Sequence, residues 1–220
     1  MTEIHTLVLG FANALLVRER GVLLVDTGIH VDEARYAAEF TRLGLQARDI
    51  QLIVVTHGHA DHYGQAALLK AMTGAPLLCH EQAAPLLRTG GHAPAVARNG
   101  LGEKVLKMLR PNLPLLAAPV EPDIVMNGEA FDLRDYGIDG RAVYTPGHTD
   151  CSISVVLASG QALVGDILVP SPFTGEPCLA YFATDEQRLL ASVRQLLGQA
   201  SLFYGGHGGP FTKDQVLKLL

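Results

Sequence analysis

The sequence contains no tryptophan and only three cysteines among its 220 residues. Cys79, Cys151 and Cys178 lie far apart and form no Cys-x-x-Cys pair, which argues against a disulfide framework and against a zinc knuckle. The N-terminal residues lack the basic start and the continuous apolar stretch of a secretory signal. We therefore expect a protein of the reducing cytoplasm, with Cys151 as a small buried thiol.

Long apolar runs and clusters of basic residues are also missing. No stretch reaches the ~18 consecutive apolar residues that a membrane-spanning helix needs, so we expect no membrane association. The chain has 17 basic and 22 acidic residues, a net charge of −5, and no lysine or arginine cluster that would follow a phosphate backbone. A nucleic acid partner is therefore not favoured, and the sequence indicates no oligomeric state.

The composition is that of a globular protein. Hydrophobic residues make up 48% of the chain and charged residues 18%, which excludes a disordered or fibrous protein. We expect residues 1–220 to form a single compact domain with a large buried core.

Short apolar runs alternate with helical patterns along the chain. The sequence predicts strands over residues 4–9, 12–17, 22–25, 52–55 and 76–80, and helices over residues 31–43 and 62–72. Further strands are predicted at 130–133, 141–145, 152–157, 162–164 and 201–204, with helices over 185–197 and 212–220. This alternation predicts a layered α/β domain.

The stretch from about residue 83 to residue 122 breaks this alternation. It contains Gly90-Gly91, several prolines and one predicted helical segment near residues 103–109. We interpret it as an insertion over one face of the domain, of the kind that often determines substrate specificity.

Nine histidines are the unusual feature of the composition. His57, His59, Asp61 and His62 follow the strand predicted over residues 52–55 directly. In an extended loop, residues i and i+2 point the same way, so His57 and His59 can converge on one ion. Asp61 and His62 begin the next helix and can turn toward a second ion. Close packing of these side chains without a cation would be electrostatically poor, so the run predicts a metal site.

Three further candidate ligands each follow a predicted strand and lie beside glycine: His148, Asp166 and His207. A neighbouring glycine lets the backbone come close to a metal ion. The remaining histidines, His5, His30, His80 and His92, are interpreted as non-ligands, although His92 lies in the insertion, where it is a candidate for reaching the substrate.

In this order along the chain, the motifs resemble the metallo-β-lactamase superfamily. The His-x-His-x-Asp-His signature of that family matches His57, His59, Asp61 and His62, its later single ligands match His148, Asp166 and His207, and its early Asp-Thr-Gly matches residues 26–28. The resemblance implies a four-layer αββα sandwich. It implies one ion on His57, His59 and His148, a second on Asp61, His62 and His207, and Asp166 as the bridge between them.

Such a site favours hydrolysis. Two divalent ions, Zn²⁺ foremost with Mn²⁺ or Fe as alternatives, would fit a nitrogen and oxygen ligand set of this kind. A metal-bridging hydroxide would attack an ester, thioester or lactone of a small-molecule substrate, with Asp61 as a catalytic residue that orients the hydroxide. We expect Asp26 to hydrogen-bond a ligand histidine and to fix its tautomer. The metal site resembles that of glyoxalase II, although we expect no C-terminal helical domain after His207.

Alternative functions stay open, because a fold does not choose among the activities of its family. A mononuclear iron enzyme resembling the persulfide dioxygenases would use His57, His148 and Asp166. A metal-dependent phosphodiesterase or nuclease, and a metal-held binding protein without turnover, are further alternatives. The best-known subclass of zinc β-lactamases has a cysteine at the position of Asp166, which argues against that subclass.

Overall fold

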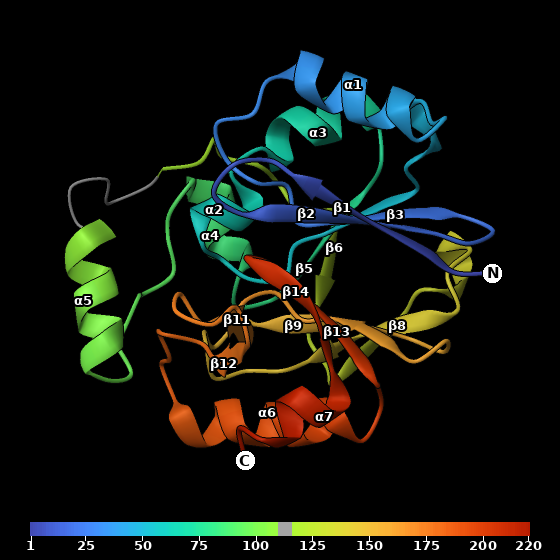
Figure 1. The fold of residues 1–220 in the computed structure, drawn as a ribbon. Coiled ribbons are helices and arrows are strands. Elements are labelled where there is room, and N and C mark those ends of the chain that lie inside the picture. Colours follow the sequence, from blue (N-terminus) through green and yellow to red (C-terminus); the bar gives the residue numbers. More distant parts are fainter. Residues whose placement is uncertain (110–115) are drawn as a thin grey trace.

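A computed structural model describes residues 1–109 and 116–220 of the protein. Two six-stranded sheets face each other, and helices cover the outer face of each sheet (Figure 1). The four-layer αββα arrangement expected from the sequence is confirmed.

The first sheet contains the N-terminal strands. Its order is β1 (Glu3–Val8), β2 (Asn13–Arg18), β3 (Val22–Val25), β4 (Leu52–Val54), β5 (Leu77–His80) and β6 (Ile124–Met126). The strands β1, β2 and β3 form an antiparallel meander, whereas β3 to β6 run parallel. The carboxyl ends of β3 and β4 therefore lie side by side, which places Asp26 next to the loop that begins with Thr56.

The second sheet presents the later candidate ligands. Its order is β14 (Gly208–Thr212), β13 (Leu202–Gly205), β10 (Gln161–Leu163), β9 (Ile153–Leu157), β8 (Gly140–Tyr144) and β7 (Ala130–Asp132). His148 lies in the turn between β8 and β9, Asp166 follows β10, and His207 lies between β13 and β14. A separate hairpin of β11 (Leu168–Pro170) and β12 (Pro177–Leu179) comes directly after Asp166.

Helices form the two outer layers. The helices α1 (Glu33–Arg42) and α3 (Ala66–Thr73) cover the first sheet, and α6 (Glu186–Leu197) and α7 (Lys213–Leu217) cover the second (Figure 1). The long helices α1 and α6 begin at Asp32 and Asp185, whose carboxylates accept hydrogen bonds from backbone N–H groups of the first turn. Within the described ranges, no helix has the length and apolar character needed to cross a bilayer.

Three apolar cores fill the spaces between the four layers. Leu16 and Leu24 pack toward α1 and α3, while Leu15 and Val25 of the same strands pack between the two sheets. A third core lies between the second sheet and the helices α6 and α7. Because side chains alternate across a strand and both faces are buried here, β2 and β3 have continuous apolar sequences.

The helix predicted over residues 62–72 is wrong as a single element. The structure has a short α2 (Ala60–Tyr63) and a separate α3, with Gly64 at the break. A Cβ at Gly64 would lie 2.4 Å from the carbonyl oxygen of Ala60 and 3.1 Å from that of Gly28. The close approach of the chain after β3 therefore requires glycine at this position.

Residues 83–122 form the crossover between the parallel strands β5 and β6. The predicted helical segment is α5 (Gly100–Leu109), but α4 (Ala84–Thr89) precedes it and was not anticipated. Leu87 of α4 is fully buried, whereas α5 projects from the body of the molecule (green in Figure 1). Residues 110–115 of this stretch lie outside the described residues.

Candidate metal centre

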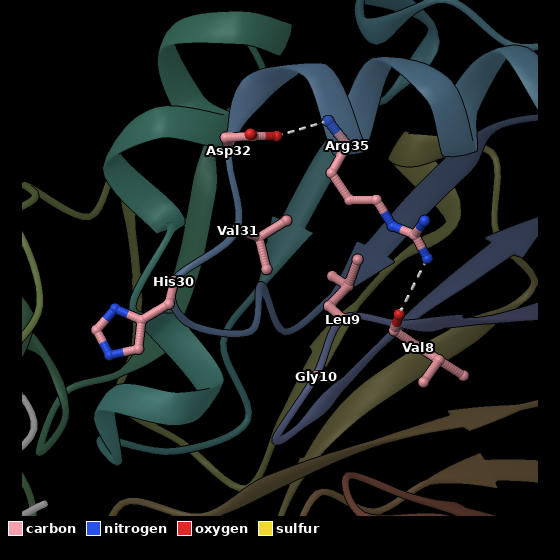
Figure 2. Close-up of a pocket in the computed structure, with 7 residues that line it drawn as sticks. All are labelled: Val8, Leu9, Gly10, His30, Val31, Asp32 and Arg35. Atoms are coloured by element: carbon pink, nitrogen blue, oxygen red, sulfur yellow. Dashed lines mark hydrogen bonds between the residues drawn. The ribbon is translucent and has the colours of Figure 1, made fainter.

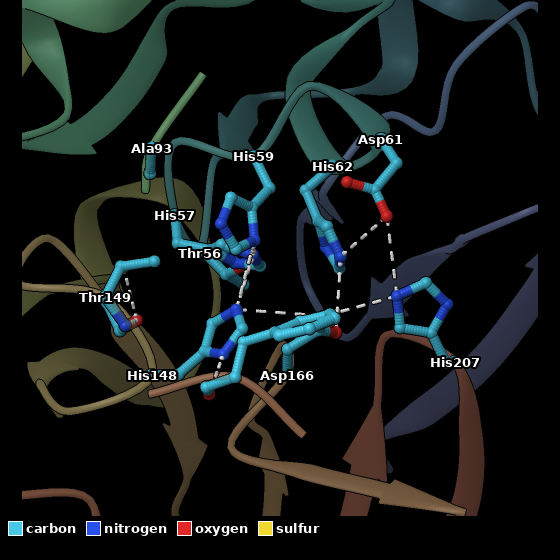
Figure 3. Close-up of polar contacts among 12 residues, drawn as sticks. Thr56, His57, His59, Asp61, His62, Ala93, His148, Thr149, Asp166 and His207 are labelled. Atoms are coloured by element: carbon cyan, nitrogen blue, oxygen red, sulfur yellow. Dashed lines mark hydrogen bonds and ion pairs between the residues drawn. The ribbon is translucent and has the colours of Figure 1, made fainter. Parts of the chain in front are cut away.

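The structure brings all seven predicted ligands together (Figure 3). They form two groups, within each of which the potential ligand atoms lie within 4.8 Å of one another: His57, His59, His148 and Asp166 in one, and Asp61, His62 and His207 in the other. Segments that follow strands of both sheets supply each group, so the site exists only when the two sheets pack face to face.

Three imidazole nitrogens face one another in the first group. Nε2 of His57 lies 3.0 Å from Nδ1 of His59 and 3.3 Å from Nε2 of His148, and the last two atoms are 3.1 Å apart. All three side chains are buried, and this burial lowers their pKa values. They are therefore neutral at pH 7, which is the state in which imidazole binds a metal.

The second group joins histidines to carboxylates. Nε2 of His207 lies 3.4 Å from Oδ2 of Asp61 and 3.2 Å from Oδ2 of Asp166. Nε2 of His62 lies 3.2 Å from Oδ1 of Asp166. Since Oδ2 of Asp166 is also 3.9 Å from Nε2 of His148, this carboxylate faces both groups.

Hydrogen bonds fix the ring orientation of the histidines in the second group and of His148. Nδ1 of His148 donates to the carbonyl oxygen of Phe182, and Nδ1 of His207 donates to that of Phe11, each over 2.9 Å. Nδ1 of His62 donates to Oδ2 of Asp26 over 2.8 Å. In each ring Nδ1 thereby keeps its proton, and Nε2 is the atom directed into the site, where it can bind a metal.

The predicted hydrogen bond between a ligand histidine and the carboxylate of Asp26 is present. Its carboxylate also accepts hydrogen bonds from the backbone N–H and the hydroxyl of Thr56, each over 2.7 Å. Because the Thr56 hydroxyl donates to Asp26, it accepts from Nδ1 of His57 at 2.9 Å. Asp26 adopts a positive φ of 60°, a conformation that aspartate tolerates better than most residues.

The charges of the second group balance one another when no metal is bound. Burial alone would lower the pKa of His207, but the carboxylates of Asp166 and Asp61 raise it to about 10. The pKa of His62 is likewise raised, because three carboxylates outweigh its burial. In turn, His207 and His62 hold the pKa of Asp166 well below its usual value despite the burial of that carboxyl group.

Unpartnered atoms indicate that a cation belongs here. Within the described residues, Nε2 of His62 and Oδ1 of Asp166 are buried and make no aligned hydrogen bond, although they lie 3.2 Å apart. Such orphaned atoms cost free energy unless another group satisfies them. A divalent cation accepts lone pairs from imidazole and carboxylate alike, so this donor set fits a metal centre.

Two glycines are required by the close approach of the loops. A Cβ at Gly206 would lie 2.4 Å from Cε1 of His62 and 2.8 Å from Oδ1 of Asp166. A Cβ at Gly165, which has a φ of +52°, would lie 2.7 Å from the Thr56 hydroxyl oxygen. The glycines seen beside the ligands in the sequence therefore serve the packing of the site itself.

Two other residues singled out from the sequence, Cys151 and His80, are buried. Cys151 is buried, and its Sγ accepts a hydrogen bond from the backbone N–H of Gly58 over 3.3 Å, which agrees with the expected buried thiol. His80 is stacked on Tyr144 at a centroid distance of 4.3 Å. The carbonyl groups of Phe11 and Phe182 were not anticipated, because any residue type supplies a backbone carbonyl.

A separate hollow of about 320 Å³ lies between the β1–β2 turn and the start of α1 (Figure 2). Arg35 lines it, donates to the carbonyl oxygen of Val8 over 3.5 Å and pairs with Glu39 at 3.1 Å. None of the seven candidate ligands lines this hollow, so the metal centre is the better candidate for the chemistry.

Comparison with known proteins agrees with this geometry. The chain is 24% identical over 228 residues to the probable metallo-hydrolase YflN of Bacillus subtilis strain 168, which covers 95% of this chain and 85% of that protein. The β-lactamase hydrolase-like protein of Xylella fastidiosa strain Temecula1 is 29% identical over 131 residues, 59% of this chain, which span only 26% of that relative's length.

A solved structure and a family model extend the comparison to the whole fold. The crystal structure of the BLEG-1 B3 metallo-β-lactamase matches with a TM-score of 0.74 and 19% identity, over 98% of this chain and 97% of that one. That likeness concerns the fold. The model of the metallo-β-lactamase superfamily matches residues 7–207, a range that includes all seven candidate ligands. The chain therefore belongs to the metallo-β-lactamase superfamily and is a metal-dependent hydrolase.

Proposed function

We propose that the protein binds two divalent metal ions and hydrolyses an ester, thioester or lactone of a small molecule. The observation that supports this most directly is the position of Asp166, whose two carboxylate oxygens face His62, His148 and His207 at 3.2 to 3.9 Å. A carboxylate with ligand histidines on both sides is suited to bridging two ions. A centre for a single ion would not need the second group.

The residues would share the ions as follows. His57, His59 and His148 would hold one, Asp61, His62 and His207 would hold the other, and Asp166 would contact both. When bound, such ions lower the pKa of a water molecule toward neutrality and stabilise negative charge that develops on a substrate oxygen. Zinc is our first choice, although nitrogen and oxygen ligands of this kind also accept manganese or iron.

The protein's own side chains would prepare the site for this chemistry. Asp26, Phe182 and Phe11 keep the protons of the ligand rings on Nδ1, so no ring has to turn before a metal binds. Asp61 directs Oδ2 toward His62 and His207, and its Oδ1 would accept a hydrogen bond from the attacking water and hold it in line with the carbonyl carbon. We propose Asp61 as a catalytic residue for this reason.

The setting of the reaction is also part of the proposal. Cys79, Cys151 and Cys178 are all free thiols, which suits the reducing cytoplasm.

The crossover of residues 83–122 lies against the metal centre through the hydrogen bond from the Ala93 N–H to the Gly58 carbonyl, over 2.8 Å. We propose that this crossover forms one wall of the substrate site.

The test is hydrolysis of an aryl ester, a thioester and a lactone by the zinc-loaded protein. Asp166→Ala should lower the rate by at least about a hundredfold, because it removes a ligand shared by both ions. The exposed Asp135 provides the control, since Asp135→Ala should leave the rate unchanged. Full activity of Asp166→Ala would refute the proposal, and one iron per chain with oxygen consumption would favour the dioxygenase alternative.

A further inference from the structure

His59 differs from the other four histidines of the metal centre. Each of those four donates from Nδ1 to an oxygen atom that fixes its ring. His59 instead directs Nδ1 toward the other ligands, and within the described part of the chain its Nε2 is buried without a hydrogen-bond partner. The contacts of its Nδ1 are all with other ligand histidines, so no oxygen atom outside the ligand group holds this ring as the other four are held.

An aromatic ring from the crossover contacts His59 instead. The ring of His92 is stacked on that of His59 with a centroid distance of 4.5 Å and an interplanar angle of 26°. The His92 ring is itself held, because its Nδ1 donates to the carbonyl oxygen of Ala93 over 2.6 Å. His59 thus packs against a ring whose own orientation is fixed.

The backbone keeps the two rings in register. The N–H of Ala93 donates to the carbonyl oxygen of Gly58 over 2.8 Å, directly beside both histidines. A Cβ at Gly58 would lie 2.5 Å from Cδ1 of Leu86 and 3.6 Å from Cβ of Ala93, so the crossover packs closely on this glycine. The loop that holds His59 is therefore attached to the crossover by its backbone as well as by the stacked rings.

We propose that His92 is the positioning residue for His59, and that the crossover thereby sets the affinity of the metal group to which His59 belongs. A metal-bound imidazole is electron-poor, and the face of an adjacent aromatic ring stabilises it and restricts its rotation. The inference rests on the proposed function in one respect, namely that His59 is a metal ligand.

The test compares three substitutions at His92. His92→Phe keeps an aromatic face, His92→Leu keeps bulk without one, and His92→Ala removes both. Val96→Ala is the matched control, because Val96 lies in the same segment with a half-exposed side chain and its carbonyl bond to Ala183 does not depend on that side chain. Zinc affinity is measured for two successive equivalents by competition with a chromophoric chelator. The visible absorption spectrum of the cobalt-substituted protein reports ligand geometry independently of activity.

His92→Ala and His92→Leu should each weaken one of the two zinc equivalents by about three- to tenfold and alter the cobalt spectrum, which is the loss expected for one aromatic stack. His92→Phe and Val96→Ala should remain within about twofold of the wild type. Unchanged affinity and spectrum in His92→Ala would overturn the inference, and so would His92→Phe weakened as much as His92→Ala. Wild-type protein that binds neither zinc, cobalt, manganese nor iron would instead refute the proposed function itself.

Discussion

The carboxylate of Asp26 accepts a hydrogen bond over 2.8 Å from Nδ1 of His62, a residue 36 positions further along the chain. The same carboxylate holds the Thr56 hydroxyl, which in turn accepts from His57. One buried side chain outside the ligand set therefore orients a histidine in each of the two metal groups. Its position at the end of β3, next to β4, makes this possible.

Substitution of Asp26 should weaken metal binding at the second group. Asp26→Asn keeps an oxygen for the Thr56 N–H and tolerates the positive φ, but it turns an amide N–H₂ toward His62. The neutral form of His62 should then carry its proton on Nε2, and zinc affinity at the second group should fall by about 10- to 100-fold. Zinc titration measures this loss, and Asp135→Asn is the exposed control. Wild-type affinity in Asp26→Asn would show that the tautomer of His62 does not matter.

Metal uptake should depend on pH at the second group only. The raised pKa values of His62 and His207 mean that both rings are protonated at pH 7 in the metal-free protein, and a metal must displace these protons. Affinity there should rise about tenfold per displaced proton between about pH 7 and pH 8. The first group has lowered pKa values and is already neutral, so its affinity should stay constant. Chelator competition at several pH values checks this, and parallel pH dependence of both equivalents would contradict it.

A single methyl group at position 206 should disrupt the centre. Gly206→Ala places a Cβ 2.4 Å from the ring of His62 and 2.8 Å from Asp166, so these ligands must move. We expect hydrolytic activity to fall by at least about a hundredfold, since ligand displacements near 1 Å have effects of this size. Gly128→Ala is the matched control, because no atom lies within 4 Å of a Cβ there. Equal activity in the two variants would mean that the loop of Gly206 adapts without cost.

The thiols should report on the packing around the centre. Burial raises the pKa of the Cys151 thiol and raises that of Cys79 to about 12, so neither forms a thiolate at pH 8. Cys178 is only half-buried. A thiol reagent should therefore modify Cys178 in the native protein and reach the other two only after denaturation. Rapid labelling of native Cys151 would show that the loop of Gly58 opens.

The local chemistry of the centre was predictable from the sequence. Four candidate ligands lie in a run of six residues directly after a buried strand: His57, His59, Asp61 and His62. The periodic patterns on either side of this run predicted the strands and most of the helices. The role of Asp26 came from the resemblance of residues 26–28 to the early Asp-Thr-Gly of the family, because an Asp-Thr-Gly turn at a strand end is by itself common. The sulfur of Cys151, expected to be buried, supports the same loop.

Other features depend on contacts that no local pattern reveals. The hairpin strands β11 and β12 include Pro170 and Pro177, and β14 contains Gly209-Pro210, residues that disfavour a strand in the sequence. The acceptor for His207 is the carbonyl of Phe11, 196 residues away. The sequence indicates only that His92 lies in the insertion, as a non-ligand that is a candidate for reaching the substrate. The folded crossover places its ring on that of His59.

The metal content of protein purified without added metal tests the central claim most directly. If Asp166 bridges two groups of ligands, elemental analysis should give about two divalent ions per chain, and a chelator should remove them together with the hydrolytic activity. Zinc added back should restore both. A stoichiometry of one ion, or activity that survives complete removal of the metal, would contradict the account.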